Sequence, residues 1–293
     1  GVDVVQTVQD DGRYNHHAKG FENEHIYKVD DKIAEKLKEF SKLLFKGTLR
    51  HSYPHSWRSK APLIYRNTPQ WFISMEKNKL RDIALKSIDE TVFYPPQGQT
   101  RLRSMIETRP DWCISRQRVW GVPLPLFVSK ETGQPLRDLE VVERIADIYE
   151  EEGSDTWFTE DPQRFLGEKY NLEDYDQVKD VVEVWFDSGS THAFCLEKRE
   201  DLKWPASMYL EGSDQHRGWF HSSLLESAGT RGRAPYESVL THGFVVDGKG
   251  RKMSKSVGNV ISPDDILKKY GVDILRLWVC LLYTSPSPRD VEE

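Results

Sequence analysis

The 293-residue sequence predicts an α/β protein with helices packed on a parallel sheet. From about residue 109 onward, short apolar runs of strand length alternate with segments of helix length, which is typical of parallel α/β folds. Two of the apolar runs lead directly into stretches rich in Gly, Ser and Asp. Because ligands bind beyond the carboxyl ends of parallel strands, we expect the chemistry at these junctions.

The N-terminal quarter predicts turns, one helix and two short apolar runs. Asp10-Asp11-Gly12 signals a turn in a β-like segment. A helix is expected from about Asp30 to Leu44, because apolar residues recur there at helical spacing. Its apolar face would consist of Ile33, Leu37, Phe40 and Leu44. The apolar runs at 62–65 and 70–73 lie among prolines, which favours strand ends and connectors.

The later elements follow the same patterns. Helices are expected at 76–90, 99–107 and 219–226, and strands at 181–186, 206–210 and 237–241. The last helix begins with Ser262 as the N-cap candidate, Pro263 in the first helical position and Asp265 at capping-box spacing. Gly271 is expected to separate this helix from a further one.

Composition limits the classes of partner and site. The net charge of −6 means that nucleic acid could be bound only by local basic patches. No stretch of about 18 apolar residues suggests a membrane span. The cysteines form no C-x-x-C pair, so we expect a reducing compartment and neither a disulfide framework nor zinc. Ser56 and Ser59, like the histidines at 16, 17, 51 and 55, do not make a metal site, and none is predicted.

Residues 247–256 form a basic loop that places four cations, two hydroxyls and two glycines in ten residues. Glycines allow such a loop to move, and lysines supply compact charges of the kind that a transferring triphosphate needs neutralised. A solvated basic turn is the alternative interpretation of this composition.

Residues 208–220 place polar residues and glycines between an apolar strand and an apolar helix, a junction that exposes backbone N–H groups. Glu211 and Asp214 can accept hydrogen bonds from an amino group or sugar hydroxyls, and His216 and Arg217 can donate to phosphate. An ordinary polar loop is the alternative. Residues 184–192 are expected to end another strand in small polar residues, and Trp185 is either core or the wall of a pocket.

Residues 109–123 interleave arginines with tryptophans. This pattern suits single-stranded nucleic acid, or equally ion pairs and core at the entry to a domain. We favour the structural role over direct contact with RNA. Cys113 is expected to be a small buried hydrophobe rather than a nucleophile.

Several of these motifs resemble one family. The K-M-S-K-S order at 252–256 resembles the signature loop of class I aminoacyl-tRNA synthetases. The segments V-W-F-D-S-G-S-T-H at 184–192 and L-E-G-S-D-Q-H-R-G-W-F at 210–220 resemble its isoleucyl form, with the valyl form as the nearest alternative. The W-C-I-S-R-Q-x-x-W-G-x-P pattern from Trp112 resembles the return of the chain from the editing insertion of these enzymes. A nucleic-acid-binding module without catalysis is the alternative of another class.

The resemblance, which runs from about residue 1 to 279, implies a domain organisation. Residues 1–60 would end the inserted editing domain, 61–108 would connect back, and 109–279 would form the C-terminal half of a Rossmann-type nucleotide-binding domain. The family's H-I-G-H motif does not occur in the sequence. We therefore expect an internal fragment that is inactive alone. Residues 280–293 resemble the translated end of a sequencing adapter, and a natural Ser/Pro-rich tail is the alternative.

The resemblance also implies a reaction: ATP-dependent ligation of isoleucine to its tRNA through isoleucyl-adenylate, with Mg²⁺ arriving on ATP and no bound zinc. The enzyme would be a cytoplasmic monomer, or lie in an organellar matrix, without membrane contact. The catalytic residues would be Lys252 and Lys255. The ATP-binding residues would be Lys255, Ser254, Ser256, Asp214, Gln215, His242 and Gly243. The aminoacyl-adenylate would contact Glu211, Gly212, Asp214, Gln215, Trp185 and Trp219.

Overall fold

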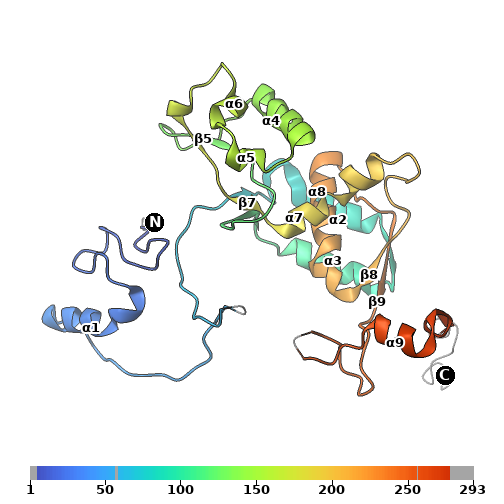
Figure 1. Cartoon of the computed structure of the whole chain (residues 1–293), viewed down its shortest axis with the longest axis horizontal. Coiled ribbons are helices and arrows are strands. Elements are labelled where there is room, and N and C mark those ends of the chain that lie inside the picture. The colour runs from blue at the N-terminus through green and yellow to red at the C-terminus, as the bar shows by residue number, and fades with distance from the viewer. Residues whose placement is uncertain (1–4, 57–58, 256, 278–293) are drawn as a thin grey trace. The chain divides into compact units, whose positions relative to one another are not determined.

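The computed structural model describes residues 5–56, 59–255 and 257–277 (Figure 1). The chain divides into two compact units, Gly1–Trp71 and Phe72–Glu293. The predicted divisions at residues 60 and 108 remain predictions. The predicted non-native tail at 280–293 lies outside the described residues.

The first unit contains a short 3₁₀ helix, η1 (Ile26–Lys28), and helix α1 (Asp30–Glu39). The turn predicted at Asp10–Gly12 is present, with Gly12 at a φ of +77°. Helix α1 begins where predicted but ends five residues before Leu44, which is fully exposed. The cause is a Schellman motif, in which Ser41 takes a φ of +55° and the Lys42 amide donates to Leu37 O at 2.8 Å.

A three-stranded parallel sheet organises the second unit and confirms the predicted fold class. Its strand order is β2 (Val92–Tyr94), β9 (Ser238–His242) and β8 (Tyr209–Gly212). Strand β9 lies within one residue of its predicted range. Strand β8 begins three residues later than predicted, since Ala206 forms only an isolated bridge with Tyr236.

Three helices pack around this sheet and form the main core. They are α2 (Leu80–Asp89), which follows the 3₁₀ turn η2 (Lys77–Lys79), α3 (Gln97–Glu107) and α8 (Trp219–Arg231). All three confirm predicted helices. Every residue of α8 from Phe220 to Ala228 is buried, so α8 is the central helix of the unit. The core includes Ala84, Ile88, Phe93, Leu102, Ile106, Leu224, Leu225 and Val239.

The predicted strand at 181–186 is wrong beyond its first two residues. Val181–Val182 form β7, which pairs antiparallel with β4 (Ser115–Arg116). The chain then turns into helix α7 (Val184–Gly189) and a π-helix, η4 (His192–Glu197), so Trp185 lies on a helix rather than at a strand end. Figure 1 shows α7 beside α8, with which it packs. Five of the six residues at 181–186 are apolar. Such a run suits a buried helix as well as a strand, and the run alone does not decide between them.

A second, smaller core lies between β4 and β7 in the sequence. Its buried centre consists of Phe127, Val141, Ile145, Ile148, Trp157, Phe165 and Leu166. Strands β5 (Phe127–Ser129) and β6 (Tyr175–Gln177) pair antiparallel. The helices are α4 (Leu139–Glu152), α5 (Thr156–Thr159), α6 (Pro162–Leu166) and the 3₁₀ turn η3 (Leu172–Asp174). Strands β1 (Phe72–Ile73) and β3 (Trp112–Cys113) pair antiparallel outside this core.

Helix α9 (Pro263–Tyr270) confirms the predicted start signal. The Ser262 hydroxyl accepts from the Asp264 amide at 3.2 Å, which satisfies one N–H of the first turn. Gly271, at a φ of +83°, ends the helix, and residues 272–277 are helical again as predicted. Within the described ranges, no helix is long and apolar enough to cross a membrane.

Candidate functional site

The two loops predicted to carry the site follow strands that end at the same edge of the parallel sheet. Gly212, the last residue of β8, pairs with His242, the last residue of β9. A Cβ atom on Gly212 would lie 3.9 Å from His242 Cε1, so the two strand ends are in close contact. The register therefore gathers the predicted residues Glu211, Gly212, Asp214, Gln215, His242 and Gly243 at one edge.

The loop after β8 folds tightly onto its own backbone. The Glu211 carboxylate accepts from the Gly212 amide at 3.2 Å. A Cβ atom on Gly212 would lie only 2.7 Å from Asp214 Oδ1, so glycine is required for the Asp214 carboxylate to approach the strand end. The 3₁₀ turn η5 (Ser213–Arg217) then leads into α8. Both carboxylates are thus held at the carboxyl end of β8, where an amino group or a ribose would find acceptors.

Gln215 caps helix α8. Its Oε1 atom accepts from the Trp219 amide at 2.9 Å. The neighbouring His216 does not fit its predicted role as a phosphate donor, because its side chain is buried and its Nδ1 atom is bonded to Ser213 O at 2.8 Å. Burial also lowers the pKa of His216 and favours its neutral form. His216 is therefore part of the support beneath the loop.

Trp219 and Trp185 lie on either side of Gly218. The Trp219 ring stacks on Tyr209, with ring centroids 4.1 Å apart and planes 5° from parallel. Its Nε1 atom donates to Ser188 O of α7 at 2.9 Å. A Cβ atom on Gly218 would lie 2.8 Å from Trp185 Cη2. Trp185 itself is 41% exposed, so part of the residue is accessible to a ligand.

A cavity of 230 Å³ borders Trp185 and Gly218. Its lining also includes residues of the Arg- and Trp-rich return segment and of α8: Arg109, Trp112, Cys113, Arg116, Glu183, Arg217, His221 and Ser222. Burial and the nearby Arg109 lower the pKa of His221 to about 3, so this histidine is neutral at pH 7.

A buried glutamate, Glu226, lies in α8. Burial, with the Asp187 and then the Glu183 carboxylate nearby, raises the pKa of Glu226 to about 9. Burial and Glu183 also raise the pKa of Asp187. Where α7 approaches α8, a Cβ atom on Gly189 would lie 2.1 Å from Glu226 Oε1. Close packing of the two helices thus leaves no room for a side chain at 189.

The basic loop is closed at its base by side chains. The Asp247 carboxylate accepts from the amides of Lys249 at 2.9 Å and Arg251 at 3.0 Å. Asn259 donates to Asp247 Oδ2 at 2.9 Å and to Lys252 O at 3.1 Å, and its Oδ1 atom accepts from the Ser254 amide at 3.0 Å. Hydrogen bonds from Asn259 and from the Arg251 amide hold the pKa of Asp247 at about 2, so the closure persists at neutral pH.

The two predicted catalytic lysines are exposed on this loop. Lys252 Nζ lies 3.5 Å from the centroid of the Phe244 ring, a cation–π contact that gives the ammonium a defined position. Ser254 is held by Asn259, as described above. Ser256 lies outside the described residues, and its predicted role remains a prediction.

The return segment supports the structural role that we favoured. Trp112 Nε1 donates to Glu183 Oε1 at 2.9 Å, and Arg116 Nη2 donates to Glu183 Oε2 at 3.1 Å. Trp112 is 5% exposed, so it is core. Farther along, Val119 and Trp120 are largely exposed and leave a surface on which other contacts are possible.

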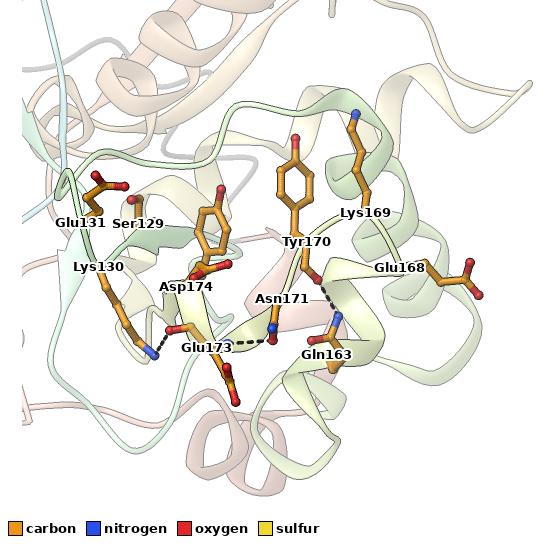
Figure 2. Close-up of a pocket in the computed structure, with 11 residues that line it drawn as sticks. Ser129, Lys130, Glu131, Gln163, Glu168, Lys169, Tyr170, Asn171, Glu173 and Asp174 are labelled. Atoms are coloured by element: carbon orange, nitrogen blue, oxygen red, sulfur yellow. Dashed lines mark hydrogen bonds between the residues drawn. The ribbon is translucent and has the colours of Figure 1, made fainter.

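The larger cavity, of 800 Å³, lies in the second core (Figure 2). Its polar groups bond largely to one another: Gln163 Nε2 donates to Tyr170 O at 2.7 Å, and Lys130 Nζ donates to Glu173 O at 2.8 Å. Asp138 accepts from Lys169 at 2.6 Å and from the Tyr170 hydroxyl at 2.7 Å. These hydrogen bonds hold the surface of the second core together. Because they occupy the polar groups, we regard the sheet edge as the better candidate for a functional site.

The sequence did not reveal three residues of the site. Glu183 and Ser188 act through partners distant in the chain, and no local pattern indicates them. Asn259 follows the K-M-S-K-S order closely, and the Asp-Gly pair at 247–248 signals the turn that it closes. The described part of the chain contains no group of three or more His, Cys, Asp or Glu side chains suited to a metal ion.

Residues 8–292 match the family model described as tRNA synthetases class I (I, L, M and V). The chain belongs to the class I tRNA synthetases. This match includes most of the stretch at 280–293 for which the sequence predicts a non-native tail.

Individual class I relatives give a consistent picture. The chain is 70% identical over 279 residues to an isoleucine–tRNA ligase of Pelagibacter ubique (strain HTCC1062), which covers 95% of this chain and 31% of the relative. It is 54% identical over 291 residues to the isoleucine–tRNA ligase of Gluconobacter oxydans (strain 621H), covering 95% of this chain and 30% of the relative. The chain thus spans about a third of the length of these ligases.

Solved synthetase structures are more distant. The Mycobacterium tuberculosis methionyl-tRNA synthetase in complex with methionyl-adenylate is 20% identical, with a TM-score of 0.45 over 77% of this chain and 36% of that one. A leucyl enzyme of Agrobacterium radiobacter K84, in a ternary complex with tRNA, is 24% identical, with a TM-score of 0.38 over 55% of this chain and 23% of that one.

Proposed function

We propose that this chain forms part of an isoleucine–tRNA ligase, which activates isoleucine with ATP and transfers it to isoleucine tRNA. The carrying observation is the pairing of Gly212 with His242, which sets the acidic β8 loop beside the strand that leads into the basic loop. The 70% identity to the Pelagibacter ligase supports isoleucine as the amino acid. In this proposal residues 109–279 belong to a Rossmann-type catalytic domain, and residues 1–60 end an editing domain.

The first step would need no covalent intermediate on the protein. The isoleucine carboxylate attacks the α-phosphate of ATP in line, and pyrophosphate leaves. Catalysis is then a matter of positioning and charge stabilisation. Lys252 and Lys255 neutralise the charge that develops on pyrophosphate, and Ser254 and Ser256 offer hydroxyls.

The β8 loop would hold the other reactant. Glu211 binds the α-amino group, and Asp214 and Gln215 bind the ribose side of the adenylate. His242 and Gly243 line the adenine side, and Trp185 and Trp219 wall the aliphatic side chain. We place Mg²⁺ on the phosphates of ATP, since that ion is usually bound by one or two carboxylates together with substrate phosphates. We further propose a cytoplasmic monomer.

The test uses a chimeric ligase, in which this chain replaces its matching 279-residue segment of the Pelagibacter enzyme. Isoleucine-dependent exchange of pyrophosphate into ATP is the expected result. The kcat/KM for valine should be about 10–200-fold lower than that for isoleucine, which is the range for discrimination by one methylene. Isoleucyl enzymes are themselves the known example of this range. The Pelagibacter enzyme is the positive control, and the isolated chain should show no exchange.

Two results would favour a different function for this chain. A preference of the chimeric ligase for valine would favour a valyl enzyme. The exposed Trp120, 86% accessible in the return segment with Arg118 nearby in sequence, is the observation that favours a non-catalytic nucleic-acid-binding module. Binding of tRNA by this chain alone, together with a chimera that shows no exchange while the Pelagibacter control is active, would support that second function.

A further inference from the structure

Helix α7, which carries Trp185, is fixed at both of its ends. At its beginning, the Glu183 carboxylate receives the Trp112 indole N–H at 2.9 Å and the Arg116 guanidinium at 3.1 Å. At its end, Ser188 O receives the Trp219 indole N–H at 2.9 Å. Because α7 spans only Val184–Gly189, these two anchors set the position of the whole helix.

The first anchor is buried and well supported. Glu183 is 7% exposed and Trp112 is 5% exposed. The Glu183 amide also donates to Ile114 O at 2.8 Å, and the Trp112 ring packs on Phe186 of α7 at a centroid distance of 5.8 Å. Charge-assisted hydrogen bonds of this kind are among the stronger ones, and a buried carboxylate that loses its partners is costly. The anchor is therefore specific to a carboxylate at 183.

The anchor lies next to the wall of the proposed isoleucine pocket. Trp185 follows Glu183 by two residues, and both line the 230 Å³ cavity together with Trp112 and Arg116. Isoleucine and valine differ by one methylene, which is worth about 10–200-fold in kcat/KM, so a small shift of the wall is enough to change the preference.

We propose that Glu183, held by Trp112 and Arg116, is a positioning residue that sets Trp185 and thereby the preference for isoleucine over valine. The W-C-I-S-R motif thus acts on Trp185 through Glu183 and α7. This inference rests on the proposed function. It gives the W-C-I-S-R motif a role in positioning Trp185. This role is separate from catalysis and from RNA binding.

Kinetics of the chimeric ligase test the proposal through Glu183→Gln, Trp112→Phe and Arg116→Met. Each should raise the KM for isoleucine by about tenfold, leave kcat within about threefold, and lower the ratio of kcat/KM values for isoleucine over valine. Glu152→Gln is the matched control, because it removes a carboxylate that pairs with Arg164 at the surface of the second core. The double variant Glu183→Gln, Arg116→Met should cost less than the sum of the single changes.

A second readout needs no activity. With 5-fluorotryptophan incorporated, the ¹⁹F resonance of Trp185, assigned by Trp185→Phe, should shift in the three test variants and stay in place in the control. The positioning role would be overturned if the Trp185 resonance and the KM for isoleucine both stayed unchanged in the test variants. It would also be overturned if these variants unfolded more easily but kept the same preference for isoleucine over valine. An unsubstituted chimera without isoleucine exchange would refute the proposed function, while the resonance would still test the anchor.

Discussion

Asn259 donates to Asp247 across twelve residues of sequence, through a 2.9 Å hydrogen bond from Nδ2 to Oδ2. The same asparagine holds the carbonyl of Lys252 and the amide of Ser254, so both branches of the basic loop meet at one side chain. The lysines therefore extend from a closed base, while their ammonium groups remain exposed. Such an arrangement fixes the backbone and keeps the charged ends accessible to a triphosphate.

Asn259→Ala should slow the chimeric ligase without weakening its hold on isoleucine. Loss of the closure displaces Lys252 and Lys255, and a misplacement near 1 Å can cost about 100-fold in rate. We expect a drop in kcat for exchange of about 10–100-fold with the KM for isoleucine nearly constant. Asn171→Ala, which removes a local cap in the second core, is the control. Equal rates in the two variants would show that the closure is dispensable.

Lys255→Ala should lower kcat far more than it alters the KM for isoleucine. A lysine that binds the leaving pyrophosphate acts mainly in the transition state, and its loss then appears in the rate. Steady-state exchange across isoleucine concentrations measures both constants. Lys249→Ala changes a cation of the same loop and should have little effect. Comparable losses in kcat and in isoleucine affinity would contradict the transition-state role of Lys255.

Gly218→Ala should impair the amino-acid pocket. The added methyl group would lie 2.8 Å from Trp185 Cη2 and 2.5 Å from Gln215 Oε1, so the ring or the α8 cap must move. We expect the KM for isoleucine to rise by about tenfold. Gly229→Ala, on the same helix, would place its methyl 3.5 Å from Leu80 Cδ1, an ordinary contact, and should leave the KM unchanged. The prediction is falsified if both variants bind isoleucine alike.

Glu226→Gln should stabilise the protein increasingly as pH rises. A glutamate with an ordinary pKa of 4.5 in the unfolded chain titrates near 9 in the fold, so folding takes up a proton between these values. The stability that depends on the neutral form is complete below pH 4.5 and is lost as pH rises through 9.

Glutamine cannot ionise, so the Glu226→Gln variant does not lose stability in this way as pH rises. The gain should be below about 1 kcal/mol at pH 5 and reach about 3 kcal/mol at pH 7. Urea unfolding of the chimeric ligase, followed by tryptophan fluorescence at pH 5, 7 and 8.5, measures the difference. Glu237→Gln, on an exposed ion pair with Lys203, is the control. A gain that does not grow with pH would mean that Glu226 is ionised in the folded protein.

Several elements of the fold could be predicted from neighbouring residues in the sequence. The start of α9 depends on Ser262 and Pro263, and β9 and α8 are apolar segments with clear flanks, so neighbouring residues suffice to predict them. The two loops at the sheet edge were also predictable, because their residue types are unusual and follow apolar runs. Their roles in catalysis remain predictions.

Distant contacts decided the rest. The run at 181–186 turns into a helix after Glu183, whose side chain bonds to Trp112, 71 residues away. Helix α1 ends at a left-handed serine, Ser41, where a glycine would have signalled the end. A pattern of neighbouring residues contains no information about the contact between Glu183 and Trp112. It also gives little reason to expect a helix end at Ser41, because serine seldom adopts the left-handed conformation.

The contact between Gly218 and the Trp185 ring has an evolutionary consequence. A lineage that replaced glycine at 218 first would force the new side chain against the Trp185 ring. A smaller residue at 185 would remove that constraint on 218. Divergence of this pocket toward another amino acid should therefore change position 185 before position 218.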